Sequence, residues 1–186
     1  MRVLPALLLV LAACGGPEPG PSPGQEGVQA PAFRPERWSR AFAGRPAPDL
    51  PLETRPDGTT TTLNEVRRRH PGRPMLVNLW ATWCAPCLKE LPTLDRLAAD
   101  ARGRLVVVPV SQDLAGWRAV NPVFTPERFP NLRTLVDSQM RLGAELAARG
   151  LPVTVLYDPQ GREVWRYEGE LDWSGPDARR LLGLER

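Results

Sequence analysis

The sequence has few of the side chains that hold structural metal ions. Its 186 residues include three cysteines and a single histidine, His70. A structural zinc site needs four ligands, normally cysteine and histidine. His70 stands in the stretch RRRHPG, and we interpret it as a surface residue at the end of a helix. We therefore predict neither a metal site nor a bound cofactor.

Lysine is almost absent, and the net charge of the chain is small. Lys89 is the only lysine, and the formal net charge is +3 at pH 7. The arginine triplet at 67–69 could contact an anionic lipid or a nucleic acid. A turn signal, Pro71-Gly72, follows the triplet and favours the solvated end of a short helix instead. Nothing else in the sequence points to nucleic acid, so we predict no nucleic-acid partner.

The apolar run near the N-terminus is too short to cross a bilayer, which takes about 20 residues. This run, 3–13, has the length of a signal-peptide hydrophobic region, so residues 1–13 are predicted to be a signal peptide. It ends in LAAC, which resembles the lipobox of bacterial lipoproteins, where the cysteine after the cleavage site carries diacylglycerol. That resemblance implies an exported protein tethered to the membrane through lipidated Cys14. An ordinary signal peptide with an incidental cysteine is the alternative.

The next stretch of the chain has almost nothing to bury. Residues 15–31 are dominated by glycine and proline, which is typical of a flexible tether. Phe33, Trp38 and Phe42 follow and favour a short helix that docks on the folded domain. We therefore predict a signal peptide at 1–13, a lipid-anchored flexible tether with a short pre-domain segment at 14–45, and one domain at 46–186.

The rest of the chain alternates between strand and helix patterns. Continuous apolar runs at 73–80 and 104–110 are typical of buried strands, and 86–101 has apolar residues at helical spacing. A turn signal at 56–58 predicts a β-hairpin at the start of the domain. Shorter helices are expected at 64–69, 113–129, 138–149 and 177–184, and further strands at 132–136, 153–157 and 163–169. This order predicts an α/β fold with a mixed central sheet flanked by helices and an N-terminal β-hairpin extension.

Two of the three cysteines lie close together, in the stretch NLWATWCAPCLKELP at 78–92. A loop of two intervening residues constrains the unfolded chain very little, so Cys84 and Cys87 are a poor structural staple. With zinc and stapling both disfavoured, redox chemistry remains as the explanation of the pair.

The position of the pair suits that chemistry, because a strand passes into a helix there. The unpaired N–H groups of a first helical turn would stabilise a thiolate at Cys84 and lower its pKa. A thiolate attacks disulfides, and Cys87 lies one turn further along, where it can attack the resulting mixed disulfide. Pro86 suits a first helical turn because no N–H is needed at that position.

The same stretch resembles thioredoxin-fold proteins, and more closely the TlpA/ResA/DsbE-like branch of membrane-anchored thiol–disulfide oxidoreductases. WCxPC is typical of the whole superfamily, whereas WATWCxPCxxExP followed by GLPVTVLYDPQG at 150–161 is much more specific for this branch. The opening APDLPLE and the closing YEGELDWSGPDARRLL also fit, so the resemblance covers roughly residues 46–184. It implies a thioredoxin-like domain that exchanges disulfides through attack by Cys84 and resolution by Cys87.

The resemblance implies roles for two residues outside the pair. Pro152, in the segment LPVT, matches the cis-proline of the family, which packs beside the disulfide and presents backbone to a substrate strand. A plain strand-initiating proline is the alternative. Glu90 matches the carboxylate that ResA-like proteins place below their cysteines, where burial would raise its pKa and let it shuttle the proton of Cys87. An exposed helix glutamate is the alternative.

Further positions have family-typical residues. Thioredoxins carry a buried aspartate six residues before the first cysteine, and here that position is Asn78, which cannot titrate. The substitution makes Glu90 the leading proton carrier. Trp83 is expected to shield the disulfide, Trp80 to lie in the core, and Pro92 to kink the helix.

The branch implies a reductant acting outside the cytoplasm. TlpA-like proteins reduce particular cysteine pairs during cytochrome c maturation or copper delivery to cytochrome oxidase, and a membrane thiol conduit re-reduces them. The implied partners of this monomer are therefore proteins with reducible cysteine pairs, that conduit and, through lipidated Cys14, the membrane at its periplasmic or extracytoplasmic face. Two alternatives stay open: a Cu(I)-binding thiol chaperone, since soft thiolates favour Cu(I), and a peroxiredoxin-like peroxidase.

Overall fold

Apolar runs of the sequence form the centre of one mixed sheet in the computed structural model, which describes residues 31–184. β4 (Met75–Trp80) is buried at every position, and it runs parallel to β5 (Val106–Ser111) and antiparallel to β7 (Val153–Tyr157). A strand covered on both faces needs apolar side chains at consecutive positions, so these runs do not alternate. The other strands are β1 (Trp38–Ser39), β2 (Leu52–Glu53), β3 (Thr60–Thr61), β6 (Leu135–Val136) and β8 (Glu163–Glu168). The order across the sheet is β1-β8-β7-β4-β5-β6-β2-β3.

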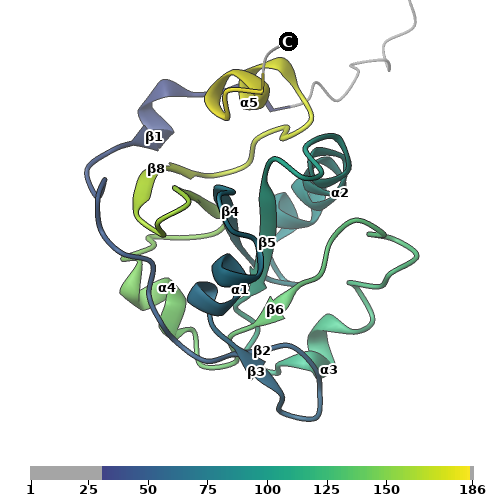
Figure 1. Ribbon diagram of the computed structural model, residues 1–186. Coiled ribbons are helices and arrows are strands. Elements are labelled where there is room, and N and C mark those ends of the chain that lie inside the picture. The colour runs from purple at the N-terminus through teal and green to yellow at the C-terminus, as the bar shows by residue number, and fades with distance from the viewer. Residues whose placement is uncertain (1–30, 185–186) are drawn as a thin grey trace, which may run out of the picture.

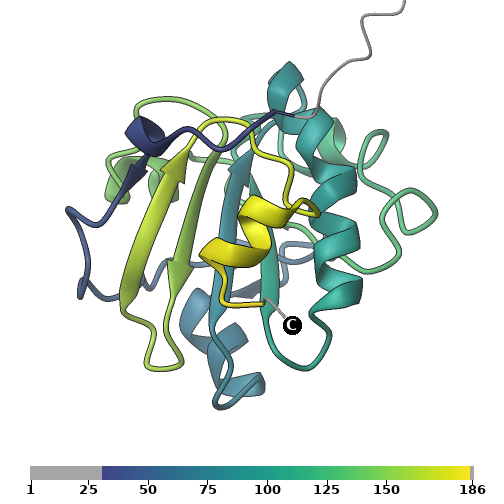
Figure 2. The same ribbon diagram turned by 90° about the horizontal axis from the view of Figure 1, so that it is seen from above.

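Helices cover both faces of this sheet. The helices are α1 (Leu63–Arg69), α2 (Ala85–Asp100), α3 (Trp117–Val120), α4 (Arg141–Glu145) and α5 (Pro176–Leu181). α2 and α5 lie on one face, and α1 and α4 lie on the other (Figure 1). Figure 2 shows α5 lying across the central strands beside α2.

The two faces of β4 belong to two apolar clusters. Leu76 and Trp80 pack in the cluster that includes α2, whereas Val77 and Leu79 pack in the cluster that includes α1 and α4. Because side chains alternate along a strand, Asn78 shares the face of Leu76 and Trp80. The fold therefore turns the amide of Asn78 toward α2.

The predicted α/β class, the mixed sheet with flanking helices and the N-terminal hairpin are confirmed. β2 pairs antiparallel with β3 in the register Leu52↔Thr61 and joins the main sheet beside β6. The hairpin thus extends the sheet at the edge that lies far from β1.

Three predicted helices differ from the structure. The segment 113–129 is mostly loop and contains only α3, because Gly116 with a φ of 58° precedes this short helix and two prolines follow it. In 138–149 only α4 is helical, and Met140 and Ala147 on either side of it have positive φ. The pre-domain segment forms a 3₁₀ turn, Pro35–Arg37, and then β1, which pairs with the open edge of β8.

The predicted signal peptide at 1–13, Cys14 and the tether up to residue 30 lie outside the described residues. Within residues 31–184, no helix is both long enough and apolar enough to cross a membrane.

Candidate active site

Cys84 is the N-cap of α2, as the sequence pattern predicts. Its Sγ accepts the backbone N–H of Cys87 at 3.3 Å, and Pro86 lies in the first turn. Cys84 and Cys87 are joined by a disulfide, with 5.3 Å between their Cα atoms. The N-terminal end of a 16-residue helix therefore points its free N–H groups at the sulfur of Cys84, where they would stabilise a thiolate.

The two cysteines differ in their access to solvent. Cys84 retains 6% exposure, whereas Cys87 is completely buried. Trp83 precedes the pair and is 65% exposed, so most of its side chain is accessible to solvent. That it shields the disulfide stays a prediction. Trp80 is buried in the core, as predicted. Only Cys84 of the pair is placed to meet the disulfide of another protein.

Glu90 lies one helical turn after Cys87 and is buried at 1% exposure. Residues three apart on a helix have their Cβ atoms about 5–6 Å apart, so the carboxyl group lies below the buried sulfur. Burial raises the pKa of Glu90 to about 8, although hydrogen bonds from Asn78, Trp173 and the backbone of Leu171 lower it. The alternative of an exposed helix glutamate is therefore excluded.

Three hydrogen bonds to Glu90 come from two separate parts of the chain. Asn78 Nδ2 on β4 donates to Oε1 at 2.6 Å, and on the segment before α5 the indole N–H of Trp173 and the backbone N–H of Leu171 donate to Oε2 at 3.1 and 3.3 Å. Asn78 Nδ2 also donates to Thr154 Oγ1 on β7 at 3.0 Å. Asn78 therefore links the helix of the cysteines to the strand that follows Pro152.

Pro152 lies directly before β7, and the Leu151–Pro152 peptide bond is cis. β7 pairs with β4 in the register Leu79↔Val153. Continuing this antiparallel register by one residue places Pro152 opposite Trp80, where β4 ends and the turn toward Cys84 begins. The cis-proline that the family resemblance implied is thus present at the same end of the sheet as the disulfide.

Several residues of the site were missed by the sequence analysis. Trp173 and Leu171 contact Glu90 from more than 80 positions away in the chain. Asp113, which follows β5, accepts hydrogen bonds from the backbone N–H and the hydroxyl of Thr82 in the turn before Cys84. The position of Asp113 was a usable signal, because the carboxyl ends of neighbouring parallel strands meet at one edge of a sheet.

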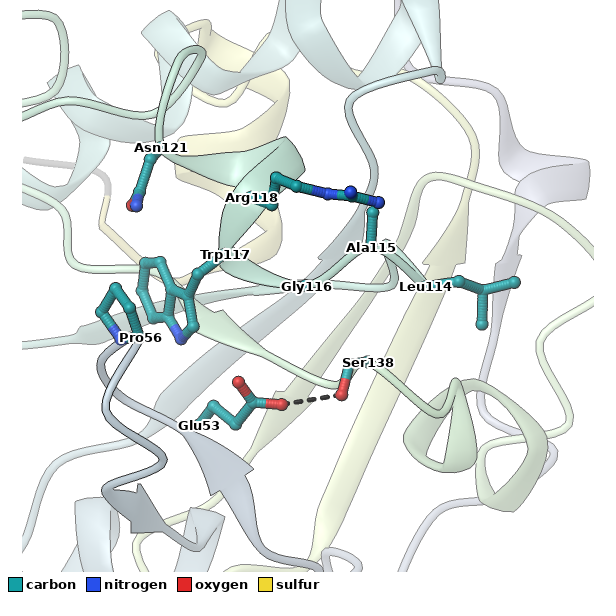
Figure 3. A pocket seen from close by; sticks show the side chains of 9 residues that line it. All are labelled: Glu53, Pro56, Leu114, Ala115, Gly116, Trp117, Arg118, Asn121 and Ser138. Carbon is teal, nitrogen blue, oxygen red and sulfur yellow. Dashed lines mark hydrogen bonds between the residues drawn. The ribbon is translucent and has the colours of Figure 1, made fainter.

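A pocket of about 510 Å³ lies where the loop after β5 meets the N-terminal hairpin formed by β2 and β3 (Figure 3). Its walls come from Glu53 and Pro56 in the hairpin, from 114–118 and Asn121 in the loop after β5, and from Ser138 after β6. Figure 3 shows the hydrogen bond from Ser138 Oγ to Glu53, which measures 2.7 Å. Neither cysteine of the pair lines this pocket.

Among residues 31–184, no group of three or more histidine, cysteine, aspartate or glutamate side chains is arranged to hold a metal ion. The groups that the structure brings together at the site are two sulfurs, a carboxyl group of raised pKa and the end of a helix. A cysteine pair in this setting, on a mixed sheet with a cis-proline beside it, defines a thiol–disulfide oxidoreductase of the thioredoxin class.

Comparison with known proteins agrees with this class. Residues 63–175 match the family model described as a thioredoxin-like domain. The thiol:disulfide interchange protein DsbE of Yersinia pestis is 33% identical over 138 residues, which cover 74% of this chain and 70% of the relative. The thiol:disulfide interchange protein HelX of Rhodobacter capsulatus is 30% identical and covers 74% of both chains. The chain belongs to the thioredoxin-like family, among its DsbE-type thiol:disulfide interchange proteins.

Solved structures show the same fold. A putative DsbE from Chlorobium tepidum matches with a TM-score of 0.58 and 22% identity, covering 76% of this chain and 93% of its own. The exposed lipoprotein thioredoxin Etrx1 of Streptococcus pneumoniae matches with a TM-score of 0.59 and 23% identity, covering 74% of this chain and all of its own.

Proposed function

We propose that this protein is an exported reductant of specific protein disulfides, and that its clients are cysteine pairs in cytochrome c maturation or in copper-site assembly of cytochrome oxidase. The observation that carries the proposal is the pairing of a slightly exposed sulfur at a helix N-terminus, Cys84, with a buried sulfur above a carboxyl group of raised pKa. The names of the DsbE and HelX relatives support the exchange chemistry.

In the proposed reaction the reduced protein transfers two electrons to its client. The thiolate of Cys84 attacks one sulfur of the client disulfide, and the other client sulfur leaves and takes up a proton. Cys87 then attacks the Cys84 sulfur of the mixed disulfide, which closes the Cys84–Cys87 bond and releases the second client sulfur as a thiol. The protein ends as a disulfide and the client as a dithiol.

Glu90 is proposed to take the proton that Cys87 must lose before it attacks. A free thiol has a pKa of about 8.5, and the pKa of Glu90 is about 8. Proton transfer between groups of similar pKa costs little free energy. Asn78, Trp173 and Leu171 hold the carboxyl group in place for this step.

The client is proposed to bind across the edge of the sheet that bears the disulfide. Trp83, Leu114 and Met140 are the exposed large apolar side chains among the described residues. They follow β4, β5 and β6, which are adjacent and parallel, so all three lie beyond the same ends of these strands. Exposed apolar side chains gathered at one edge are typical of a protein-binding surface.

The protein is further proposed to work at the periplasmic or extracytoplasmic face, held by lipid on Cys14 and re-reduced by a membrane thiol conduit. The signal-like run at 1–13 and the lipobox-like LAAC support this location. The glycine- and proline-rich composition of residues 15–31 is typical of a tether, which would let the domain reach its partners.

The direction of exchange is tested by equilibrium with glutathione. A reductant should have a midpoint potential well below about −120 mV, the value of a strong oxidant such as DsbA. A midpoint potential near that value would overturn the proposal that the protein acts as a reductant. A Cys87→Ser variant, which cannot resolve the mixed disulfide, should capture the client covalently through Cys84, and identification of the captured protein by mass spectrometry tests the proposed client class.

A further inference from the structure

A buried carboxylate holds the turn that leads into Cys84. Asp113 is only 3% exposed. Its Oδ2 accepts the backbone N–H of Thr82 at 2.9 Å and the hydroxyl of Ser111 at 2.8 Å, and its Oδ1 accepts the hydroxyl of Thr82 at 2.7 Å. No arginine or lysine forms an ion pair with Asp113 within residues 31–184. The carboxylate is therefore balanced only by neutral donors.

Besides the apolar packing of Ala81 and Cys84, one backbone hydrogen bond closes the turn. This bond of 3.1 Å runs from the N–H of Cys84 to the carbonyl of Ala81. Trp83, the residue between Thr82 and the nucleophile, is 65% exposed and packs little of its side chain. Thr82 thus carries the polar anchor of the turn, and that anchor is Asp113.

We propose that Asp113 is a positioning residue for disulfide exchange, which anchors the active-site turn through Thr82 and places a fixed negative charge beside the turn that disfavours the thiolate of Cys84. The inference rests on the exchange chemistry of the cysteine pair and not on the choice of client.

The charge can act on the nucleophile because the carboxylate is buried and is bonded to Thr82, which precedes Cys84 in the same turn. Thr82 and Cys84 are two residues apart, which a chain can span with at most about 7 Å. A buried charge is screened by salt much less than a surface charge. Disfavouring the thiolate makes the dithiol less stable relative to the disulfide, and the dithiol then gives up its two electrons more readily. Glu90, three residues after Cys87 on α2, acts in the same direction whenever it is ionised.

Two substitutions separate the anchor from the charge. In Asp113→Asn the amide oxygen can accept both bonds of Oδ2, and the amide nitrogen can donate to the hydroxyl of Thr82, which rotates to accept. The anchor is kept and the charge is lost. In Asp113→Ala both are lost, and the buried N–H of Thr82 is left without its acceptor.

Asp137 provides a matched control in the neighbouring strand connection. It is also 3% exposed and follows β6 as Asp113 follows β5. Its Oδ2 accepts the N–H of Leu142 at 2.7 Å, so this carboxylate anchors the start of α4 instead of the active-site turn. Asp137→Asn and Asp137→Ala therefore report the general effect of altering a buried carboxylate at this edge.

The four variants and the unaltered chain are equilibrated with glutathione, and their rates of insulin disulfide reduction are measured. Asp113→Asn should shift the glutathione equilibrium toward the dithiol by about threefold or more, while Asp137→Asn stays within about twofold of the unaltered chain. Asp113→Ala should reduce insulin at least about tenfold more slowly than Asp137→Ala, because the nucleophile is no longer held in place.

Equal equilibria for Asp113→Asn and Asp137→Asn would overturn the role of the charge, and equal rates for the two alanine variants would overturn the anchor. If Asp113→Ala does not fold, the comparison of Asp113→Asn with Asp137→Asn still tests the role of the charge. An oxidising midpoint in the unaltered chain would contradict the proposed reductant but leave the comparison of the variants valid, so the two failures are distinguishable.

Discussion

The pKa of Glu90 lies near that of a thiol, at about 8, because three hydrogen bonds to its carboxyl group do not offset its burial, so the group can both take up and return a proton close to neutral pH. A surface glutamate at the same helical position would be ionised at pH 7 and could not exchange a proton with a thiol as an equal partner. The environment of one side chain thus sets both the chemistry of the site and its dependence on pH.

The same burial makes stability depend on pH. The pKa of Glu90 rises from 4.5, the ordinary value of a glutamate, to about 8 in the folded protein. Between these values the folded state binds more protons than the unfolded chain, so the free energy of unfolding falls as pH rises, by roughly 3–5 kcal/mol across the window. Glu90→Gln should remove this slope. Urea unfolding of the disulfide form at pH 5, 6.5 and 8 checks it, and parallel pH profiles for the two proteins would contradict a protonated Glu90.

Glu90→Gln should also slow client reduction by about 10²-fold, the usual scale for a positioned acid–base group. The amide can still occupy the cavity but cannot accept the proton of Cys87. Asp95→Asn is the control, because Asp95 lies on the same helix, is 9% exposed, and accepts hydrogen bonds from Asn131 instead of facing the pair. Stopped-flow measurement of Trp fluorescence during reduction of a protein disulfide would compare them. If Glu90→Gln and the unaltered chain reduce the client at equal rates from pH 6 to 8, Glu90 has no role as a proton carrier.

At the scale of secondary-structure elements, the connections after β4, β5 and β6 carry the exposed apolar residues that are proposed to meet client proteins. The loop after β5 is the most prominent of these, since Leu114 is 71% exposed and its neighbours line the pocket of Figure 3. Asp113, near the start of this loop, is hydrogen-bonded to the active-site turn. The loop therefore joins a candidate client surface to the position of the nucleophile.

Leu114→Ser should lower kcat/KM for a protein disulfide by about tenfold or more, because covering a leucine side chain contributes about 1.5–3 kcal/mol. Reduction of a small aromatic disulfide should be unchanged, since it needs no contact with the loop. Melting temperature should also be unchanged, because Leu114 is largely exposed before the substitution. Equal losses with both substrates would place the effect at the cysteines instead of at a client surface.

The regular elements that the sequence predicted well are those whose pattern of apolar residues is set by burial. β4 and β5 have continuous apolar runs, and α2 follows the helical spacing of its leucines. The segment 113–129 was predicted poorly because its apolar residues pack from a loop, with Gly116 and two prolines breaking the helix.

The candidate site divides in the same way. Cys84, Cys87 and Glu90 are neighbours on one helix, so their spacing in the sequence already shows their relation. Trp173 and Asp113 reach the site only through the tertiary fold. A local pattern carries no information on Trp173, and the position of Asp113 after a strand indicates the edge of the sheet but not its partner, because a single polar residue there has many other possible uses.

At the scale of the whole molecule, the segment before the predicted boundary at residue 46 is built into the sheet. β1 pairs with β8 in the register Trp38↔Tyr167, and the ring of Phe33 stacks on Tyr167 with 5.6 Å between centroids. Phe42 lies against the guanidinium of Arg166 at 4.0 Å. Arg166 forms a buried ion pair of 2.7 Å with Glu163.

A chain that starts at residue 46 should therefore be less stable than one that starts at residue 31. The shorter chain loses β1, the partner of β8, and the ring of Phe42 that covers Arg166. Burial of the three partly covered aromatic side chains Phe33, Trp38 and Phe42 contributes about 3–5 kcal/mol to the free energy of unfolding. For a domain of this size, that loss lowers the melting temperature by roughly 10 °C. Calorimetry of both chains measures this difference in melting temperature. The chain from residue 31 should have the same melting temperature as the full-length protein because it keeps every described contact. Equal melting of all three chains would instead place the start of the domain at residue 46, as the sequence predicted.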